Sequence, residues 1–97
     1  MHADRLRTPD VERLLAAFAA LGDPDDVYSF LQDVCTVREI REMSQRLEVA
    51  RMLSAGEHYD DIREATGAST TTISRVSRCL NYGADGYRTV LSRIREA

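Results

Sequence analysis

Apolar residues recur every three or four positions along most of the chain, which is the period of an amphipathic α-helix. Thr8-Pro9 and Asp23-Pro24 each join a helix-capping residue to a proline, and proline favours the first position of a helix. The apolar stripes that follow these two signals should end near Gly22 and Cys35. The first third of the chain therefore predicts two short helices.

A longer apolar stripe begins after Thr36 and continues to Gly56. Thr36 and Glu39 have the spacing of a capping box, which marks the start of a helix. Three further helical segments are expected beyond Gly56, at 59–66, 69–81 and 87–94. No stretch of β-branched residues alternates as a strand would. The pattern predicts an all-α fold of about six helices.

Length and composition favour one globular domain that covers residues 1–97. The chain has 97 residues, of which 43% are hydrophobic, and a typical domain has about 100–200 residues. No apolar run approaches the roughly 18 residues of a membrane span, and the first residues lack the regions of a signal peptide. We expect a cytoplasmic protein with no membrane partner.

The cysteines and histidines predict neither a metal site nor a catalytic site. Cys35 and Cys79 form no CxxC pattern, so two buried free thiols are expected rather than a disulfide or a zinc site. His2 lies near the terminus and His58 in a predicted turn, without a partner at metal-ligand spacing. We expect no metal, no catalytic residue and no enzyme activity.

The segment from Tyr59 to Leu80 has the pattern of a helix, a glycine turn and a second helix. Gly67 falls where the chain must turn, and glycine adopts a positive φ there at little cost. Ser69 can cap the second helix. Five apolar residues are placed to bury the angle between the two helices: Ile62, Ala65, Ile73, Val76 and Leu80. This pattern predicts a helix-turn-helix over about residues 59–81.

The outer face of the second helix has small hydroxyl side chains at its start and arginines one and two turns later. Small side chains allow close approach to a DNA groove, hydroxyls bond phosphates or base edges, and arginine can bond guanine in a bidentate manner. The candidate DNA-binding residues are Ser69, Thr70, Thr71, Thr72, Ser74, Arg75 and Arg78. Double-stranded DNA is therefore the expected partner.

The distribution of charge agrees with a DNA partner although the chain carries a formal net charge of −3. Residues 1–37 carry −4 and residues 38–67 carry −2, whereas residues 68–97 carry +3. The stretch from Ala68 to Ala84 contains two arginines and no acid. The acidity thus lies outside the segment that is expected to meet phosphate.

The end of the second helix falls at Asn81-Tyr82-Gly83. Gly83 is expected in the left-handed conformation that commonly ends a helix, with Tyr82 packed as an amphipathic cover. A phosphate contact from the Tyr82 hydroxyl is the alternative.

Several segments resemble the Trp repressor family, and within it the TrpR-related YerC/YecD branch. The resemblance covers roughly residues 10–92 and rests on these stretches: Thr36–Arg46, Leu53–Glu57, Thr66–Arg75, Ser74–Gly83 and Gly86-Tyr87. It implies an intertwined homodimer in which each helix-turn-helix enters one half of a near-palindromic operator. A sequence-specific DNA-binding transcriptional regulator, and a repressor, is the function that the resemblance implies.

The resemblance also implies a pocket for a small-molecule corepressor. In the Trp repressor, tryptophan sits between two arginines, and Arg46 and Arg75 match these positions. Thr36 matches a threonine near the amino end of the ligand, and Cys79 matches a serine of the pocket. Val76 stands where the repressor has glycine beside the indole, and its three extra carbons argue against tryptophan itself.

Other interpretations stay open. Arg46 can form an ion pair with Glu42, and Arg75 can contact phosphate without any ligand. The competing functions are a non-catalytic protein-interaction module and a small Arg-rich helical enzyme of the chorismate mutase type, which needs a long first helix. If the dimer intertwines as in the family, Cys35 and Cys79 of different copies could also form a redox-sensitive bond.

Overall fold

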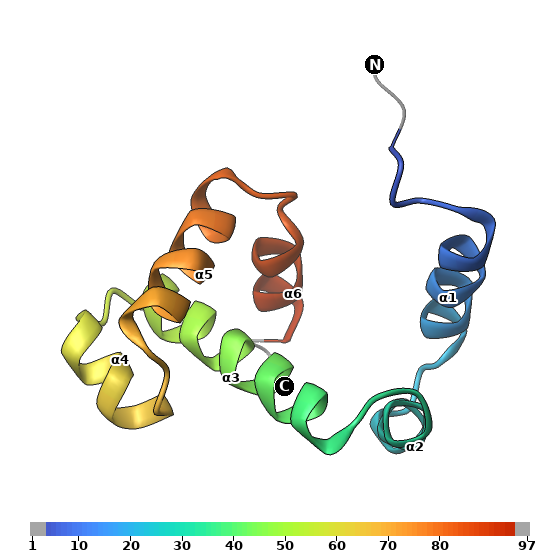
Figure 1. Cartoon of the computed structure of the whole chain (residues 1–97), viewed down its shortest axis with the longest axis horizontal. Helices are drawn as coiled ribbons and strands as arrows, with labels where there is room; N and C mark the ends of the chain where they lie inside the picture. The colour runs from blue at the N-terminus through green and yellow to red at the C-terminus, as the bar shows by residue number, and fades with distance from the viewer. Residues whose placement is uncertain (1–3, 95–97) are drawn as a thin grey trace. The chain divides into compact units, whose positions relative to one another are not determined.

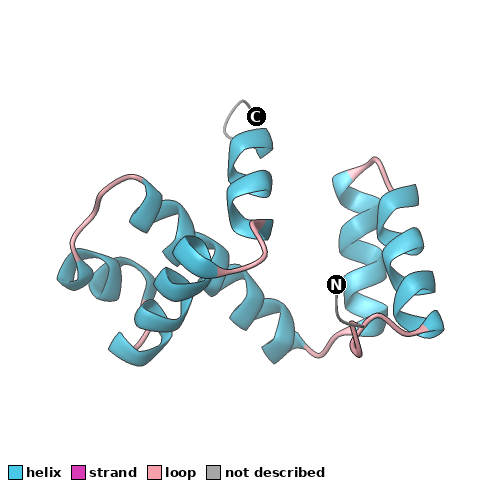
Figure 2. Cartoon of the chain, turned by 90° about the horizontal axis from the view of Figure 1, so that it is seen from above, coloured by secondary structure: helices cyan, strands magenta, loops and turns pink. Residues whose placement is uncertain are grey.

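The computed structural model describes residues 4–94, and every regular element in this range is an α-helix (Figure 2). The all-α fold with six helices is therefore confirmed for the described residues. Contacts divide the chain into two compact units, of which the first ends at Val37 and the second begins at Arg38. The expectation of a single domain stays a prediction.

The first unit contains α1 (Pro9–Ala20) and α2 (Pro24–Val34), as the proline signals predicted. Asp23 caps α2, because its carboxylate accepts a hydrogen bond of 2.9 Å from the backbone N–H of Asp25. The rings of Phe18 and Phe30 meet edge to face with their centroids 5.2 Å apart. No residue of either helix is buried. Since α1 has only 12 residues, the long first helix of a chorismate mutase-type enzyme is absent.

The second unit contains most of α3 (Val37–Ser54) together with α4 (Tyr59–Thr66), α5 (Thr70–Tyr82) and α6 (Gly86–Ile94) (Figure 1). Its core joins α3 to the α4–α5 pair through Val49, Ala50, Met52, Ile62, Ala68, Ile73 and Val76. Leu53, Tyr87 and Leu91 pack against this core from α3 and α6. The core therefore packs α5 against α3.

Ala65 was expected in this core and is exposed, so that part of the prediction is wrong. The inner face of α4 runs from Ile62 to Thr66, whose hydroxyl donates a hydrogen bond of 2.7 Å to the Ile62 carbonyl. The chain then turns at Gly67, and the turn carries Ala68 into the core. A residue of the turn thus takes the place that the helical pattern assigned to Ala65.

The end of α5 also differs from expectation. Gly83 has φ −89° and not the left-handed conformation, and Tyr82 is 88% exposed instead of packed. Glycine is needed for a steric reason, because a Cβ at position 83 would lie 2.3 Å from the carbonyl oxygen of Cys79. The end of α5 is held by Arg88, whose Nε donates a hydrogen bond of 2.8 Å to the Leu80 carbonyl. A side chain of α6 thus does the capping that the glycine was expected to do.

Candidate DNA-binding interface

The turn between α4 and α5 has the geometry that the sequence predicted. Gly67 has φ 74°, in the left-handed region that favours glycine. Ser69 is the N-cap of α5, and its Oγ accepts a hydrogen bond of 3.1 Å from the backbone N–H of Thr72. Thr66 Oγ1 accepts a hydrogen bond of 3.1 Å from the N–H of Ala68. Local hydrogen bonds therefore fix both sides of the turn.

The outer face of α5 presents most of the predicted DNA-binding side chains to solvent. The exposed members are Ser69, Thr70, Thr71, Ser74, Arg75 and Arg78. Thr72 is half-buried, and its Oγ1 accepts a hydrogen bond of 3.1 Å from Ser69 Oγ. Ser69 and Thr72 therefore serve first to begin the helix, whereas the other hydroxyls and the two arginines are available to a partner.

Tyr82 belongs to the same face, which the sequence pattern indicated only as an alternative. It lies four positions after Arg78 and seven positions after Arg75, so all three side chains project from neighbouring turns of one side of α5. Its aromatic ring is almost fully exposed. The helical spacing from Arg75 was the signal that could have identified it.

No ion pair within residues 4–94 neutralises the charge at this face. Neither Arg75 nor Arg78 forms an ion pair or a side-chain hydrogen bond with any residue from 4 to 94. Other arginines of this unit do: Arg38 with Glu42 at 3.4 Å, Arg51 with Glu48, and Arg63 with Asp60 at 3.7 Å. The two arginines of α5 thus keep their full donor capacity for an anionic partner.

Two acids of α4 lie at the end of the helix that is far from the turn. Asp60 and Asp61 lie in the first turn of α4, where carboxylates interact favourably with the helix dipole.

On α3, hydrogen bonds from Arg51 lower the pKa of the Glu48 carboxyl. That carboxylate is therefore already paired at neutral pH.

The structure brings Arg46 and Arg75 together on one hollow of about 300 Å³, which Glu42, Gln45 and Thr72 also line. Glu42 pairs with Arg38 and, among the described residues, not with Arg46, so the ion pair considered for Arg46 is absent. Two guanidinium groups that border one hollow suit a carboxylate or a phosphate.

The other two residues expected around a ligand are not among those that line this hollow. Thr36 falls in the first unit, before the boundary at Val37. Cys79 borders a separate apolar hollow of about 530 Å³ between α3, α5 and α6. Both cysteines are free, but Cys79 is exposed and Cys35 half-buried, so the expectation of two buried thiols is wrong. Cys79 is not buried because the buried side of α5 is filled by Ile73, Val76 and Leu80.

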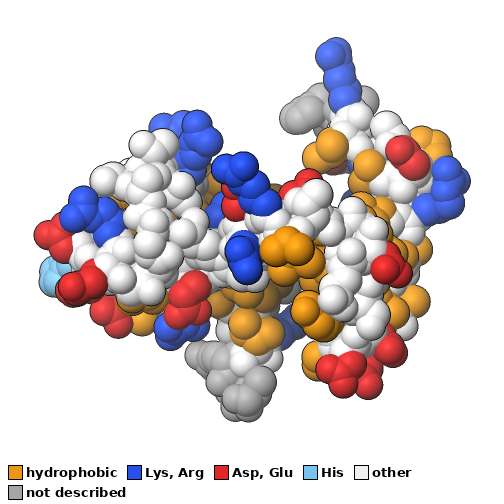
Figure 3. Space-filling model, turned by 60° about the horizontal axis from the view of Figure 1, so that its bottom comes forward, with side chains coloured by type: hydrophobic (Ala, Val, Ile, Leu, Met, Phe, Trp, Pro, Cys, Tyr) orange, Lys and Arg blue, Asp and Glu red, His pale blue; other side chains and the backbone are white. Residues whose placement is uncertain are grey.

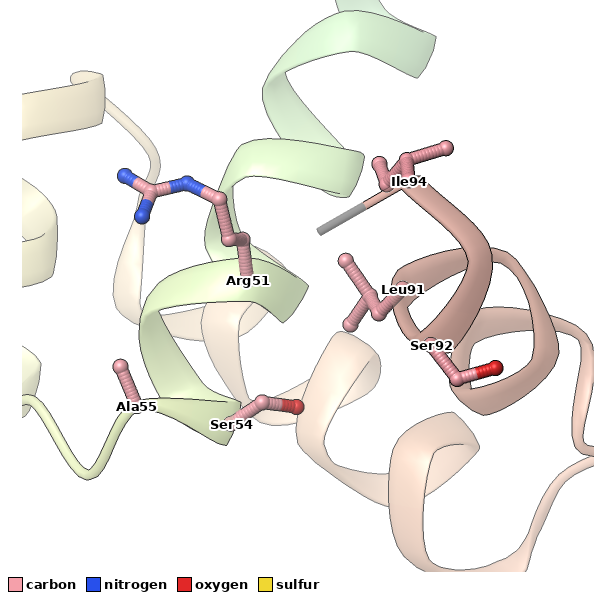
Figure 4. A pocket seen from close by; sticks show the side chains of 6 residues that line it. All are labelled: Arg51, Ser54, Ala55, Leu91, Ser92 and Ile94. Atoms are coloured by element: carbon pink, nitrogen blue, oxygen red, sulfur yellow. The ribbon is translucent and has the colours of Figure 1, made fainter. Parts of the chain in front are cut away.

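A third hollow, of about 520 Å³, lies between the end of α3 and α6. Leu91 of α6 faces Ser54 of α3 across it, while the guanidinium of Arg51 points away from α6 (Figure 4). Of the described residues that line it, Arg51 alone is charged, so residues 4–94 bring no set of charged groups together there for an ionic ligand.

Between residues 4 and 94, no group of His, Cys, Asp and Glu side chains comes together as metal ligands. No helix in the described part of the chain is long and apolar enough to cross a membrane.

Two helices joined by a glycine turn on a shared core, with hydroxyls and unpaired arginines on the outer face of the second helix, define a helix-turn-helix DNA-binding regulator.

Comparisons with known proteins identify the family. The family model described as Trp repressor protein matches residues 10–95. The uncharacterized protein YerC of Bacillus subtilis (strain 168) is 49% identical over 96 residues, which are 99% of this chain and 92% of that protein. The chain belongs to the Trp repressor family and is of the YerC type.

Two solved structures share the fold. A TrpR-like protein from Eubacterium eligens ATCC 27750 is 53% identical and superposes with a TM-score of 0.90, over 96% of both chains. A candidate Trp repressor from Staphylococcus aureus is 42% identical with a TM-score of 0.90, over 98% of this chain and 95% of that one. The Trp-repressor-like fold expected from the resemblance is therefore confirmed.

Proposed function

We propose that the protein is a homodimeric transcriptional repressor that recognises a near-palindromic DNA site through α5. The observation that carries the proposal is the outer face of α5, where Arg75 and Arg78 are exposed and unpaired beside a cluster of hydroxyl side chains. A guanidinium can hold the O6 and N7 atoms of guanine in the major groove, and hydroxyls can hold flanking phosphates. The Trp repressor family is a regulatory and not an enzymatic one, which agrees with this role.

A second copy of the chain is proposed to cover the apolar faces of α1 and α2. These helices have no buried residue, and several of their large apolar side chains are exposed to solvent: Phe18 is 37% exposed, Tyr28 56% and Val34 53%. The first unit ends at Val37. Domains shorter than about 40 residues usually need a disulfide, a metal or oligomerisation to be stable. Hydrophobic side chains are visible on the surface of this unit in Figure 3. A dimer also supplies the two reading helices that a palindromic site requires.

Arg46 and Arg75 are proposed to hold a small anionic effector in the hollow of about 300 Å³ that they line. Small-molecule sites typically measure about 300–1,000 Å³, so only a compact ligand fits. Val76 is not among the residues that line this hollow, since it is 2% exposed and packs into the core. A carboxylate or a phosphate is the chemical group that two guanidinium groups can hold by paired hydrogen bonds.

The test of DNA recognition is a gel-shift titration against genomic fragments at two salt concentrations. Specific fragments should bind more tightly than the non-specific background, and the affinity should fall as salt rises. Uniform weak binding to all fragments would contradict sequence recognition. A protein that sediments as a stable dimer but does not bind duplex DNA would instead be a protein-interaction module.

Variants assign the recognition to α5. Arg75→Ala or Arg78→Ala should each weaken specific binding by about 5- to 150-fold per half-site, because the bidentate bond from an arginine to a base is worth about 1–3 kcal/mol. Arg93→Ala removes the same charge from α6, outside the helix-turn-helix, and serves as the matched control. Equal weakening in all three variants would mean that overall charge, and not α5, determines the affinity.

A further inference from the structure

A polar contact joins α3 to the helix-turn-helix outside the apolar core. The Nε2 of Gln45 donates a hydrogen bond of 3.0 Å to the backbone carbonyl of Thr66, the last residue of α4. The same nitrogen lies 4.0 Å from the position that a Cβ on Gly67 would occupy. The side chain of Gln45 therefore lies directly against the turn of the helix-turn-helix.

This hydrogen bond satisfies a group that the helix leaves open. The last four carbonyls of an α-helix have no partner within the helix, and Thr66 contributes one of them. Both Gln45 and Thr66 are half-buried, so water does not have free access to the pair. The Thr66 hydroxyl bonds Ile62 and Ala68, which ties the carbonyl to both arms of the turn. A shift of the Gln45 amide is thus transmitted to α4 and to the start of α5.

The contact also attaches the turn to α3 at a second place, outside the apolar core. The core residues of α3 begin at Val49, one turn after Gln45, and apolar contacts do not fix an angle as a hydrogen bond does. The second point of attachment at Gln45 sets the orientation in which α5 presents Arg75.

We propose that Gln45 is a positioning residue for DNA recognition, which holds the turn of the helix-turn-helix in its reading orientation without touching DNA. This inference rests on the proposed function for its DNA readout. Gln45 also lines the hollow of Arg46 and Arg75, so an occupant of that hollow would lie beside the link between α3 and the turn. Gln45 carries no charge and adds nothing to the electrostatic attraction for DNA, so its role in recognition comes from its hydrogen bond to the turn.

The test replaces Gln45 by Met, which keeps the length of the side chain and removes the donor, and by Asn, which keeps the amide but is too short. Gln32→Met is the matched control, because Gln32 is the other glutamine of the chain and lies exposed on α2. Each purified protein is measured for affinity to its specific fragment and to random duplex DNA, and for amide hydrogen exchange at Gly67, Ala68 and Val76.

For both Gln45 variants we expect specific affinity to fall about tenfold, with affinity for random duplex unchanged, since the net charge is unchanged. Exchange at Gly67 and Ala68 should accelerate about tenfold while Val76 in the core keeps its rate. Gln32→Met should match the wild type. Unchanged specific affinity and exchange would overturn the proposal, as would equal weakening for specific and random DNA.

Failure of the fold in both Gln45 variants, with Gln32→Met folded, would also overturn the proposal, because Gln45 would then be a structural residue. The exchange measurement needs no DNA. If the wild type lacks site preference, the proposed function fails, and faster exchange confined to Gly67 and Ala68 still supports the link between Gln45 and the turn.

Discussion

Gly83→Ala should destabilise the protein because a methyl group has no room at the end of α5. The added Cβ would lie 2.3 Å from the Cys79 carbonyl oxygen and 3.0 Å from both the carbonyl carbon and the Cα of Cys79. All three are backbone atoms, so no flexible side chain can move away, and the last turn of α5 must shift. Overpacking of this kind typically costs about 1–3 kcal/mol.

The destabilisation is measured as the midpoint of thermal unfolding, followed by circular dichroism at one fixed protein concentration. For a chain of this size, 1 kcal/mol corresponds to about 4–8 °C, so Gly83→Ala should melt roughly 5–20 °C below the wild type. Gly86→Ala is the matched control, since a Cβ there meets nothing within 4 Å and Gly86 begins α6. It should melt at or slightly above the wild-type temperature. Equal midpoints for the two variants would refute the steric explanation.

Two further predictions concern local interactions. Ser69→Ala removes the N-cap of α5 and should lower the free energy of unfolding, measured by urea titration, by about 1 kcal/mol. Thr71 is exposed, and Thr71→Ala should change the free energy of unfolding by less than about 0.5 kcal/mol. Equal effects of the two substitutions would contradict the capping role. Because Arg51 lowers the pKa of the Glu48 carboxyl, the stabilising effect of that carboxylate is present at neutral pH and is lost as the pH falls through the lowered pKa. Glu48→Gln should therefore be less stable than the wild type by a few tenths of a kcal/mol at neutral pH, about the value of an exposed ion pair, and equally stable in acid. A constant difference between neutral and acidic urea titrations would contradict this assignment.

Local signals predicted the helices because each signal acts within a few residues. Asp23-Pro24 marks the start of α2, and Gly67 marks the turn, since capping and positive φ depend only on the neighbouring backbone. The face of α5 followed in the same way from helical spacing. These parts of the fold and of the candidate interface were therefore accessible without the structure.

The remainder depends on contacts between segments that are distant in sequence. Nothing near Gln45 indicates that its amide meets the Thr66 carbonyl 21 residues later. The capping of α5 by Arg88 likewise spans the turn before α6, and it replaces the left-handed glycine that the local pattern favoured. Ala68 and not Ala65 is buried, because the direction of the chain after Gly67 decides which alanine reaches the core.

The central claim is that α5 reads one DNA sequence. Recovery of the DNA bound to the protein in cells, for the wild type and for Arg75→Ala, tests it most directly. We predict that one near-palindromic site, with half-sites about one helical turn apart, dominates the wild-type sample and is absent from the Arg75→Ala sample. Recovery of the genome without preference, or of the same dominant site with both proteins, would contradict the claim.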